Sequence, residues 1–145
     1  MAASVCVDAS LAISLLLPDD TTPQASELWR SWKENGLDVV TAPLFFAEVT
    51  SVLRENVYFR RILPEEGEVA FRAFLSFPVR SVALTDLQPR AWELAKTHNL
   101  RRAYDAQYLA VAASLGCDLW TADQRLVNAV RLPWLRWVGD HRVAQ

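Results

Sequence analysis

Two acidic residues follow short apolar segments that are typical of buried strands. Asp8 comes directly after residues 5–7, and Asp123 comes two residues after the segment 119–121; a helical pattern follows each acid. In a parallel sheet the carboxyl ends of the strands share one edge, and ligands bind there. Asp is also a preferred first residue of a helix, so each acid taken singly is equally explained as a helix cap.

Two further acids lie in segments with helical spacing. Glu48 falls inside an apolar stripe, three residues after Phe45 and four before Val52, and a buried carboxylate is costly unless it is paired or binds a metal. Arg54 or Arg101 are candidate partners if Glu48 is merely structural. Asp105 lies in the first turn of its predicted helix, where an acid also complements the helix dipole.

Clustered carboxylates have a chemical purpose when a divalent cation is present. Two such charges about 5 Å apart repel by roughly 3 kcal/mol at an effective dielectric of 20. A hard cation such as Mg²⁺ binds oxygen ligands, and it leaves coordination positions for water and phosphate. Such a metal activates water and aligns a phosphodiester for attack. If the four acids converge, the pattern predicts metal-assisted phosphodiester hydrolysis.

Predicted strands and helices alternate along the chain, and these elements must position the four acids. Hydrophobic periodicity, with Pro before helices and Gly after them, predicts helices over 11–17, 22–35, 44–58, from 64 onward, 89–98, 104–115 and 123–130. Strands are predicted over 4–7, 37–41, 79–84, 119–121 and 135–138. Alternation of this kind predicts right-handed crossovers and an α/β fold, a three-layer α/β/α sandwich with a central, mostly parallel sheet.

Composition limits the possible classes. The 145 residues carry a net charge of −2, so RNA binding would need a local basic patch. No apolar run is long enough to cross a membrane, and no basic leader precedes the first strand, so we expect a cytoplasmic protein. Two cysteines, Cys6 and Cys117, form neither a disulfide framework nor a metal site, and His98 and His141 lack metal-ligand spacing.

Four segments together resemble the PIN-domain family, and most closely the ribonuclease toxins of VapBC-type toxin–antitoxin pairs. They are Val-Asp-Ala-Ser at 7–10, Phe-Ala-Glu-Val at 46–49, Tyr-Asp-Ala-Gln-Tyr-Leu-Ala-Val-Ala at 104–112 and Thr-Ala-Asp-Gln-Arg-Leu at 121–126. The last two are the most specific. The resemblance spans nearly the whole chain, which we therefore expect to be a single PIN-like nuclease domain over residues 1–145.

The resemblance implies an endoribonuclease that depends on Mg²⁺ or Mn²⁺ and leaves 5′-phosphate and 3′-hydroxyl ends. Asp8, Glu48, Asp105 and Asp123 match the acidic quartet of the family, as catalytic residues and metal ligands. Ser10 and Thr121 match its supporting polar positions, and Asn128 falls near a further polar position. Arg101, Arg102 and Arg125 flank the acids and are expected to bind RNA phosphates, since the guanidinium fork suits phosphate.

Acids at strand ends are also typical of two other kinds of α/β domain. A phosphatase of the strand-end aspartate type needs a second acid two residues after Asp8, where Ser10 stands; a receiver domain needs a late lysine, but the only lysines are Lys33 and Lys96. The remaining alternative is a non-catalytic PIN-like module that binds RNA or protein.

The segment 54–77 suggests a partner surface because it carries more apolar side chains than one helix face can bury. The resemblance implies a cognate antitoxin, a homodimer, or both; a core hairpin of two helices is the alternative.

Overall fold

The computed structural model describes residues 3–143. Five parallel strands form one sheet in the order β3-β2-β1-β4-β5. Their bounds are Ser4–Val7 (β1), Asp38–Thr41 (β2), Arg80–Ser81 (β3), Leu119–Thr121 (β4) and Leu135–Trp137 (β5). The predicted α/β fold is confirmed, and every strand pair in the described chain is parallel.

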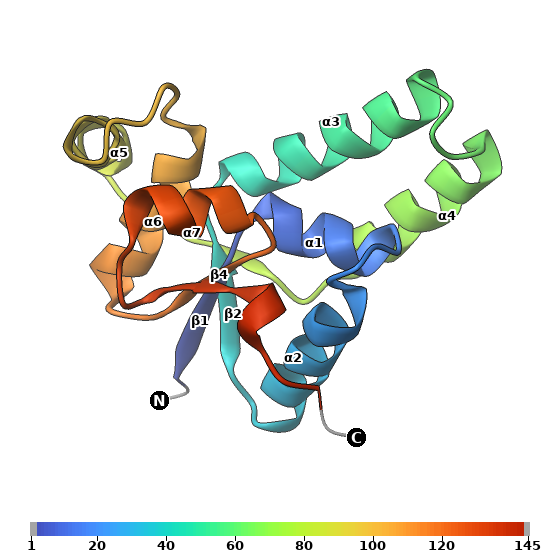
Figure 1. Ribbon diagram of the computed structural model, residues 1–145, viewed down its shortest axis with the longest axis horizontal. Coiled ribbons are helices and arrows are strands. Elements are labelled where there is room, and N and C mark those ends of the chain that lie inside the picture. Colours follow the sequence, from blue (N-terminus) through green and yellow to red (C-terminus); the bar gives the residue numbers. More distant parts are fainter. Residues whose placement is uncertain (1–2, 144–145) are drawn as a thin grey trace.

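The helices form two groups that cover the sheet and give three layers (Figure 1). The first group packs around α1 and comprises α1 (Ala9–Leu16), α2 (Thr22–Glu34), α3 (Leu44–Tyr58) and α4 (Pro64–Leu75). The second group comprises α5 (Leu87–Thr97), α6 (Tyr104–Leu115) and α7 (Gln124–Val130). The short 3₁₀ helix η1 (Val138–Asp140) packs against α2 of the first group. No helix within residues 3–143 is long and apolar enough to span a membrane.

The direction of the chain across the sheet reverses between β1 and β4. From β1 the chain moves outward through β2 to β3, then returns by way of α5 and α6 to β4, on the other side of β1. Such a reversal leaves a crevice at the carboxyl ends of the two neighbouring strands, which is the usual ligand site in open α/β sheets. Asp8 and Asp123 follow these two strands.

The core lies between the sheet and its helices. Val7, Phe45, Leu109 and Leu119 are completely buried. Apart from Asp105 in its first turn, helix α6 has only uncharged residues, and it is buried from Ala106 to Ala112, as expected of a helix enclosed by the sheet and α5. It is a rigid support for Asp105, the second residue of the helix.

One predicted strand is wrong in its length. The segment 79–84 was expected to be a full strand, but β3 holds only Arg80 and Ser81. The amide of Val82 still donates to the carbonyl of Thr41, the last residue of β2. Because the neighbouring strand ends there, pairing stops at Val82, and residues 83–84 leave the sheet.

Helices α3 and α4 form a hairpin that extends away from the sheet (Figure 1). At Gly67 the two helices approach so closely that a Cβ atom would lie 2.4 Å from Cγ2 of Val57. A side chain at this position would force the helices apart. The glycine therefore sets the spacing of the hairpin, which carries Glu48 on its first helix.

Candidate active site

Asp8 is buried at the end of β1 and serves two purposes there. One carboxylate oxygen, Oδ1, accepts hydrogen bonds from the amide of Leu11 (3.1 Å) and the hydroxyl of Ser10 (2.7 Å). The other, Oδ2, accepts from the hydroxyl of Thr121 (2.6 Å). Asp8 thus caps α1, and it is also joined to β4 by a hydroxyl from the neighbouring strand.

Ser10 and Thr121 connect the loops that follow β1 and β4. Their hydroxyl oxygens lie 3.0 Å apart. The hydroxyl of Ser10 also accepts from the amide of Ala122 (2.9 Å), and that of Thr121 accepts from the amide of Asp123 (3.0 Å). The two side chains therefore fix the distance between the strand ends on which Asp8 and Asp123 stand.

Asp123 is the N-cap of α7, and its carboxylate accepts a hydrogen bond from the amide of Arg125 (3.0 Å). The same oxygen lies 3.8 Å from the guanidinium of Arg125, whose side chain is 96% exposed. This exposed ion pair is too loose and too well solvated to contribute much stability. It leaves the arginine free to contact a ligand.

Glu48 reaches the site from α3, and it is not paired with an arginine. Neither Arg54 nor Arg101 forms an ion pair with it within residues 3–143; instead its Oε1 atom accepts a hydrogen bond from the hydroxyl of Tyr108 at 2.6 Å. Tyr108 is almost fully buried on α6. The ion pair considered for Glu48 is therefore absent from residues 3–143, and a neutral phenol is its hydrogen-bond donor instead.

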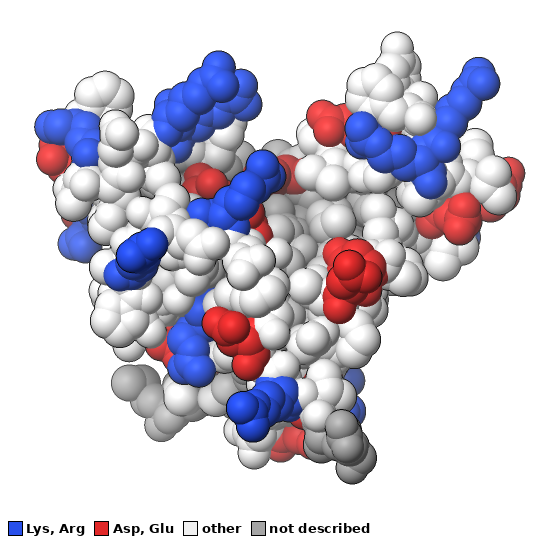
Figure 2. Space-filling model, in the orientation of Figure 1, with Lys and Arg blue, Asp and Glu red and all other residues white. Residues whose placement is uncertain are grey.

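The four acids face one hollow of about 130 Å³, lined by Asp8, Ala9, Ser10, Glu48, Asp105, Tyr108 and Asp123. A wider hollow of about 400 Å³ adjoins it and shares Glu48 and Asp123; its further lining includes Ile13, Asp19, Val52 and Arg125. The two together form a cleft that narrows toward the carboxylates. In Figure 2, blue basic side chains stand beside the hollow in the upper middle of the view, with red acidic side chains between them.

Burial and like charge both act on the carboxyl groups. Burial raises the pKa of Asp8 to about 7, against the lowering effect of its hydrogen bonds to Thr121, Ser10 and Leu11; the charge of Asp105 adds to the rise. The pKa of Asp105 is raised to about 6, by burial first and then by the charges of Asp123 and Glu48. The acids are therefore near enough to repel one another.

The oxygen ligands suit a hard divalent cation rather than zinc. Within residues 3–143, however, no three acidic, histidine or cysteine side chains are arranged to chelate one ion together. Mg²⁺ commonly binds through one or two carboxylates and keeps several waters. The hollow fits that mode of binding.

The remaining predicted residues lie farther from the acids. Arg101 and Arg102 are exposed in the turn before α6, and Asn128 is exposed on α7; none of the three lines either hollow. Sequence reasoning assigned no role to Tyr108 or to Asp19, which both line the cleft. The spacing of Tyr108, three residues after Asp105 on a helix, is a signal that places both on one helix face.

The comparison with known proteins now decides the family. The PIN domain family model matches residues 5–132. The chain belongs to the PIN-domain family. Ribonuclease VapC12 of Mycobacterium tuberculosis is 36% identical over 126 residues, which cover 86% of this chain and 91% of VapC12. This PIN-domain protein is thus related to VapC ribonucleases, as the sequence motifs predicted.

Solved structures confirm the PIN fold. One is VapC20 of M. tuberculosis, described as a toxin that cleaves the sarcin-ricin loop; its TM-score is 0.65 at 24% identity, with 90% of this chain and 96% of VapC20 covered. A toxin–antitoxin complex from Klebsiella pneumoniae contains a chain with a TM-score of 0.60 at 16% identity, covering 85% of this chain and 89% of that one.

Proposed function

We propose that this PIN-domain protein is a metal-dependent endoribonuclease and the toxin of a toxin–antitoxin pair. The observation that carries the proposal is the convergence of Asp8, Glu48, Asp105 and Asp123 from four different elements on one hollow. A set of mutually repelling carboxylates destabilises a protein without its ion, so a purely structural role does not account for it. Relationship to VapC ribonucleases indicates RNA as the substrate.

The acids would hold Mg²⁺ or Mn²⁺, either directly or through water. Bound there, the ion would supply Lewis acidity and lower the pKa of water. Ser10 and Thr121 keep Asp8 in place by occupying both of its oxygens. Glu48 keeps Oε2 free of any hydrogen bond from residues 3–143 and is thus able to orient the attacking water.

Arginines at the rim would bind the RNA backbone. Arg125 lines the wider hollow beside Asp123. Arg101 and Arg102 are exposed just before Asp105, and neither forms an ion pair within the described part of the chain. Phosphates bound by these groups would lie next to the carboxylates. This explains how a chain with a net charge of −2 attracts an anionic substrate.

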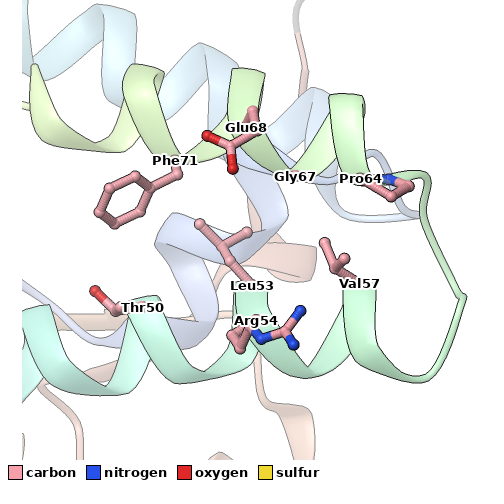
Figure 3. A pocket seen from close by; sticks show the side chains of 8 residues that line it. All are labelled: Thr50, Leu53, Arg54, Val57, Pro64, Gly67, Glu68 and Phe71. Atoms are coloured by element: carbon pink, nitrogen blue, oxygen red, sulfur yellow. The ribbon is translucent and has the colours of Figure 1, made fainter.

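The α3–α4 hairpin would bind the antitoxin. Tyr58, Phe59, Leu63, Val69 and Leu75 are all more than half exposed on it. Two hollows adjoin them: one of about 500 Å³ between α1 and α4, and one of about 320 Å³ between α3 and α4, lined by Leu53, Arg54, Val57, Glu68 and Phe71 among others (Figure 3). Phe74, by contrast, belongs to the core. The segment 54–77 is therefore partly core and partly an open apolar surface, as an interface requires.

A homodimer is the second proposed partner, and it would use the same apolar surface.

The product of the gene immediately upstream is the first antitoxin candidate to test by co-purification. A Val69→Lys variant should lose that complex while it retains RNA cleavage, because Val69 is exposed and lies outside the cleft.

The function is tested with a purified protein and a structured RNA. We expect cleavage with Mg²⁺ or Mn²⁺, products with 5′-phosphate ends, and no cleavage in excess EDTA. Asp105→Asn purified in the same way should be inactive, which excludes a contaminating nuclease. Full activity in metal-free buffer with EDTA would refute the proposal, and RNA binding without cleavage in either metal would identify a non-catalytic module instead.

A further inference from the structure

Tyr108 is a buried polar side chain that the proposed chemistry does not yet use. Its ring is about 1% exposed, on the face of α6 that also carries Asp105. Its hydroxyl donates to Oε1 of Glu48 at 2.6 Å, across the gap between α6 and α3. A distance this short is typical of a hydroxyl donating to an ionised carboxylate, which is a strong type of hydrogen bond.

Glu48 needs such a contact to remain in the site. Glu48 and Asp105 line the same hollow of about 130 Å³, where like charges repel. The Glu48 side chain is long, only partly buried, and forms no ion pair within residues 3–143. Without a donor, solvation and repulsion would both draw it out of the hollow.

We propose that Tyr108 is a positioning residue that holds Glu48 in the active site by its hydroxyl group. The inference rests on the proposed nuclease function. The phenol holds Oε1, while Oε2 accepts no hydrogen bond from residues 3–143 and is left available for the reaction. Helix α6 thereby fixes two acids of the site, Asp105 directly and Glu48 through Tyr108.

A phenol suits this role better than a cation would. An arginine or lysine in its place would neutralise Glu48 and compete with a metal ion for the carboxylate. The hydroxyl of Tyr108 donates one hydrogen bond and leaves the negative charge intact. A phenol has an ordinary pKa of about 10, so it is protonated at neutral pH and can donate.

The test is Tyr108→Phe, which keeps the ring and removes only the hydroxyl. Tyr104→Phe is the matched control, because Tyr104 lies on the same helix but is 55% exposed. We expect Tyr108→Phe to lower kcat for RNA cleavage by roughly tenfold to a hundredfold, the effect of misplacing a reacting group, with KM unchanged. Tyr104→Phe should leave kcat at the wild-type value.

A double-mutant cycle with Glu48→Ala separates positioning from general damage. Once Glu48 is absent, Tyr108→Phe should cause no further loss of kcat, because its effect passes through that carboxylate. Three results would overturn the proposal. Tyr108→Phe could keep the wild-type kcat, it could lower kcat equally in the Glu48→Ala background, or it could change KM and leave kcat unchanged. If the wild type itself cleaves no RNA, the nuclease function fails; the coupling of the two residues is then read from thermal melts of the same four proteins, and additive melting temperatures would overturn the positioning contact.

Discussion

Asp8 caps a helix and lines the candidate active site with the same carboxylate. Sequence patterns present these as competing interpretations, because a capping acid and a catalytic acid look alike at the end of a strand. The structure shows that they are compatible: the amide of Leu11 and the hydroxyls of Ser10 and Thr121 approach Asp8 together. Capping fixes the carboxylate in one orientation, which is what a preorganised site requires.

The raised pKa values of Asp8 and Asp105 predict an unusual pH dependence of stability. An acid whose folded pKa lies above its unfolded value binds more protons in the native state at intermediate pH. The free energy of unfolding of the metal-free protein should therefore fall as the pH rises from about 4 to about 7, the folded pKa of Asp8. From pH 5 to pH 8 we expect a loss on the order of 2 kcal/mol, measured by urea unfolding of metal-stripped protein.

The control for this pH dependence is Asp8→Asn. Its stability should vary less with pH over the same range, and the difference from the wild type isolates this carboxyl group from the two histidines. Asp38 and Asp86, whose pKa values are lowered by Arg80 and Arg90, change stability only below about pH 4. A wild-type stability that is flat or rises from pH 5 to pH 8 would show that the carboxylates are not buried against one another.

At the level of single residues, the sequence predicted the acids but not their partners. Glu48 stood out because a carboxylate interrupts an apolar helix stripe, but the donor that satisfies it is 60 residues away on another helix. Periodicity indicates which face of a helix is buried, and it carries no information about which helix packs there. The Tyr108–Glu48 contact could therefore be found only in three dimensions.

At the level of elements, sheet order brings the acids together. β1 and β4 are neighbours, with Val7 paired to Trp120, although more than 100 residues separate them. Helix boundaries were largely predictable from local chemistry: Pro64 begins α4, and Gly116, in the left-handed conformation, ends α6. The length of β3 was not predictable from local chemistry, because it depends on where its neighbour β2 ends.

The turn before α6 predicts a measurable effect on RNA binding. Replacing Arg101 and Arg102 together by Ala should weaken binding and reduce its salt dependence, because each phosphate contact releases condensed counterions. Each lost contact should lower the slope of log affinity against log salt by about 0.7 for single-stranded RNA. Fluorescence anisotropy with Asp105→Asn protein, which we expect to be inactive, measures the slope without cleavage.

A matched pair on α2 serves as the control for charge alone. Arg30 and Lys33 are both exposed, and neither lines the cleft. Their double replacement by Ala removes the same number of positive charges and should leave the salt slope close to that of the wild type. If both double variants reduce the slope equally, binding follows net charge, and the turn before α6 has no special part in it.

At the level of the whole molecule, stability and activity are opposed. The fold leaves Asp8 only 3% exposed and gathers three more acids around one small hollow, so the metal-free protein retains their repulsion. Such a trade-off between stability and activity is common at active sites. Under the proposed function, a bound divalent cation would remove the repulsion and stabilise the native state by mass action.

Thermal melting of wild type and Asp105→Asn, with EDTA and with Mg²⁺, tests this account most directly. Asp105 accepts no hydrogen bond from the described residues, so the substitution removes mainly charge. In EDTA at pH 8 the variant should melt roughly 3 °C higher than wild type, corresponding to about 1 kcal/mol, although it cleaves no RNA. Mg²⁺ should raise the melting temperature of wild type more than that of the variant.

Glu65→Gln supplies the control for the alternative role of Asp105. Glu65 is likewise an acid in the first turn of a helix, α4, but it lies outside the cluster. Glu65→Gln should lower the melting temperature slightly, because only the favourable interaction of the carboxylate with the helix dipole is removed. If Asp105→Asn also melts below wild type in EDTA, and Mg²⁺ shifts neither protein, the acids do not form a shared metal site and the central claim is contradicted.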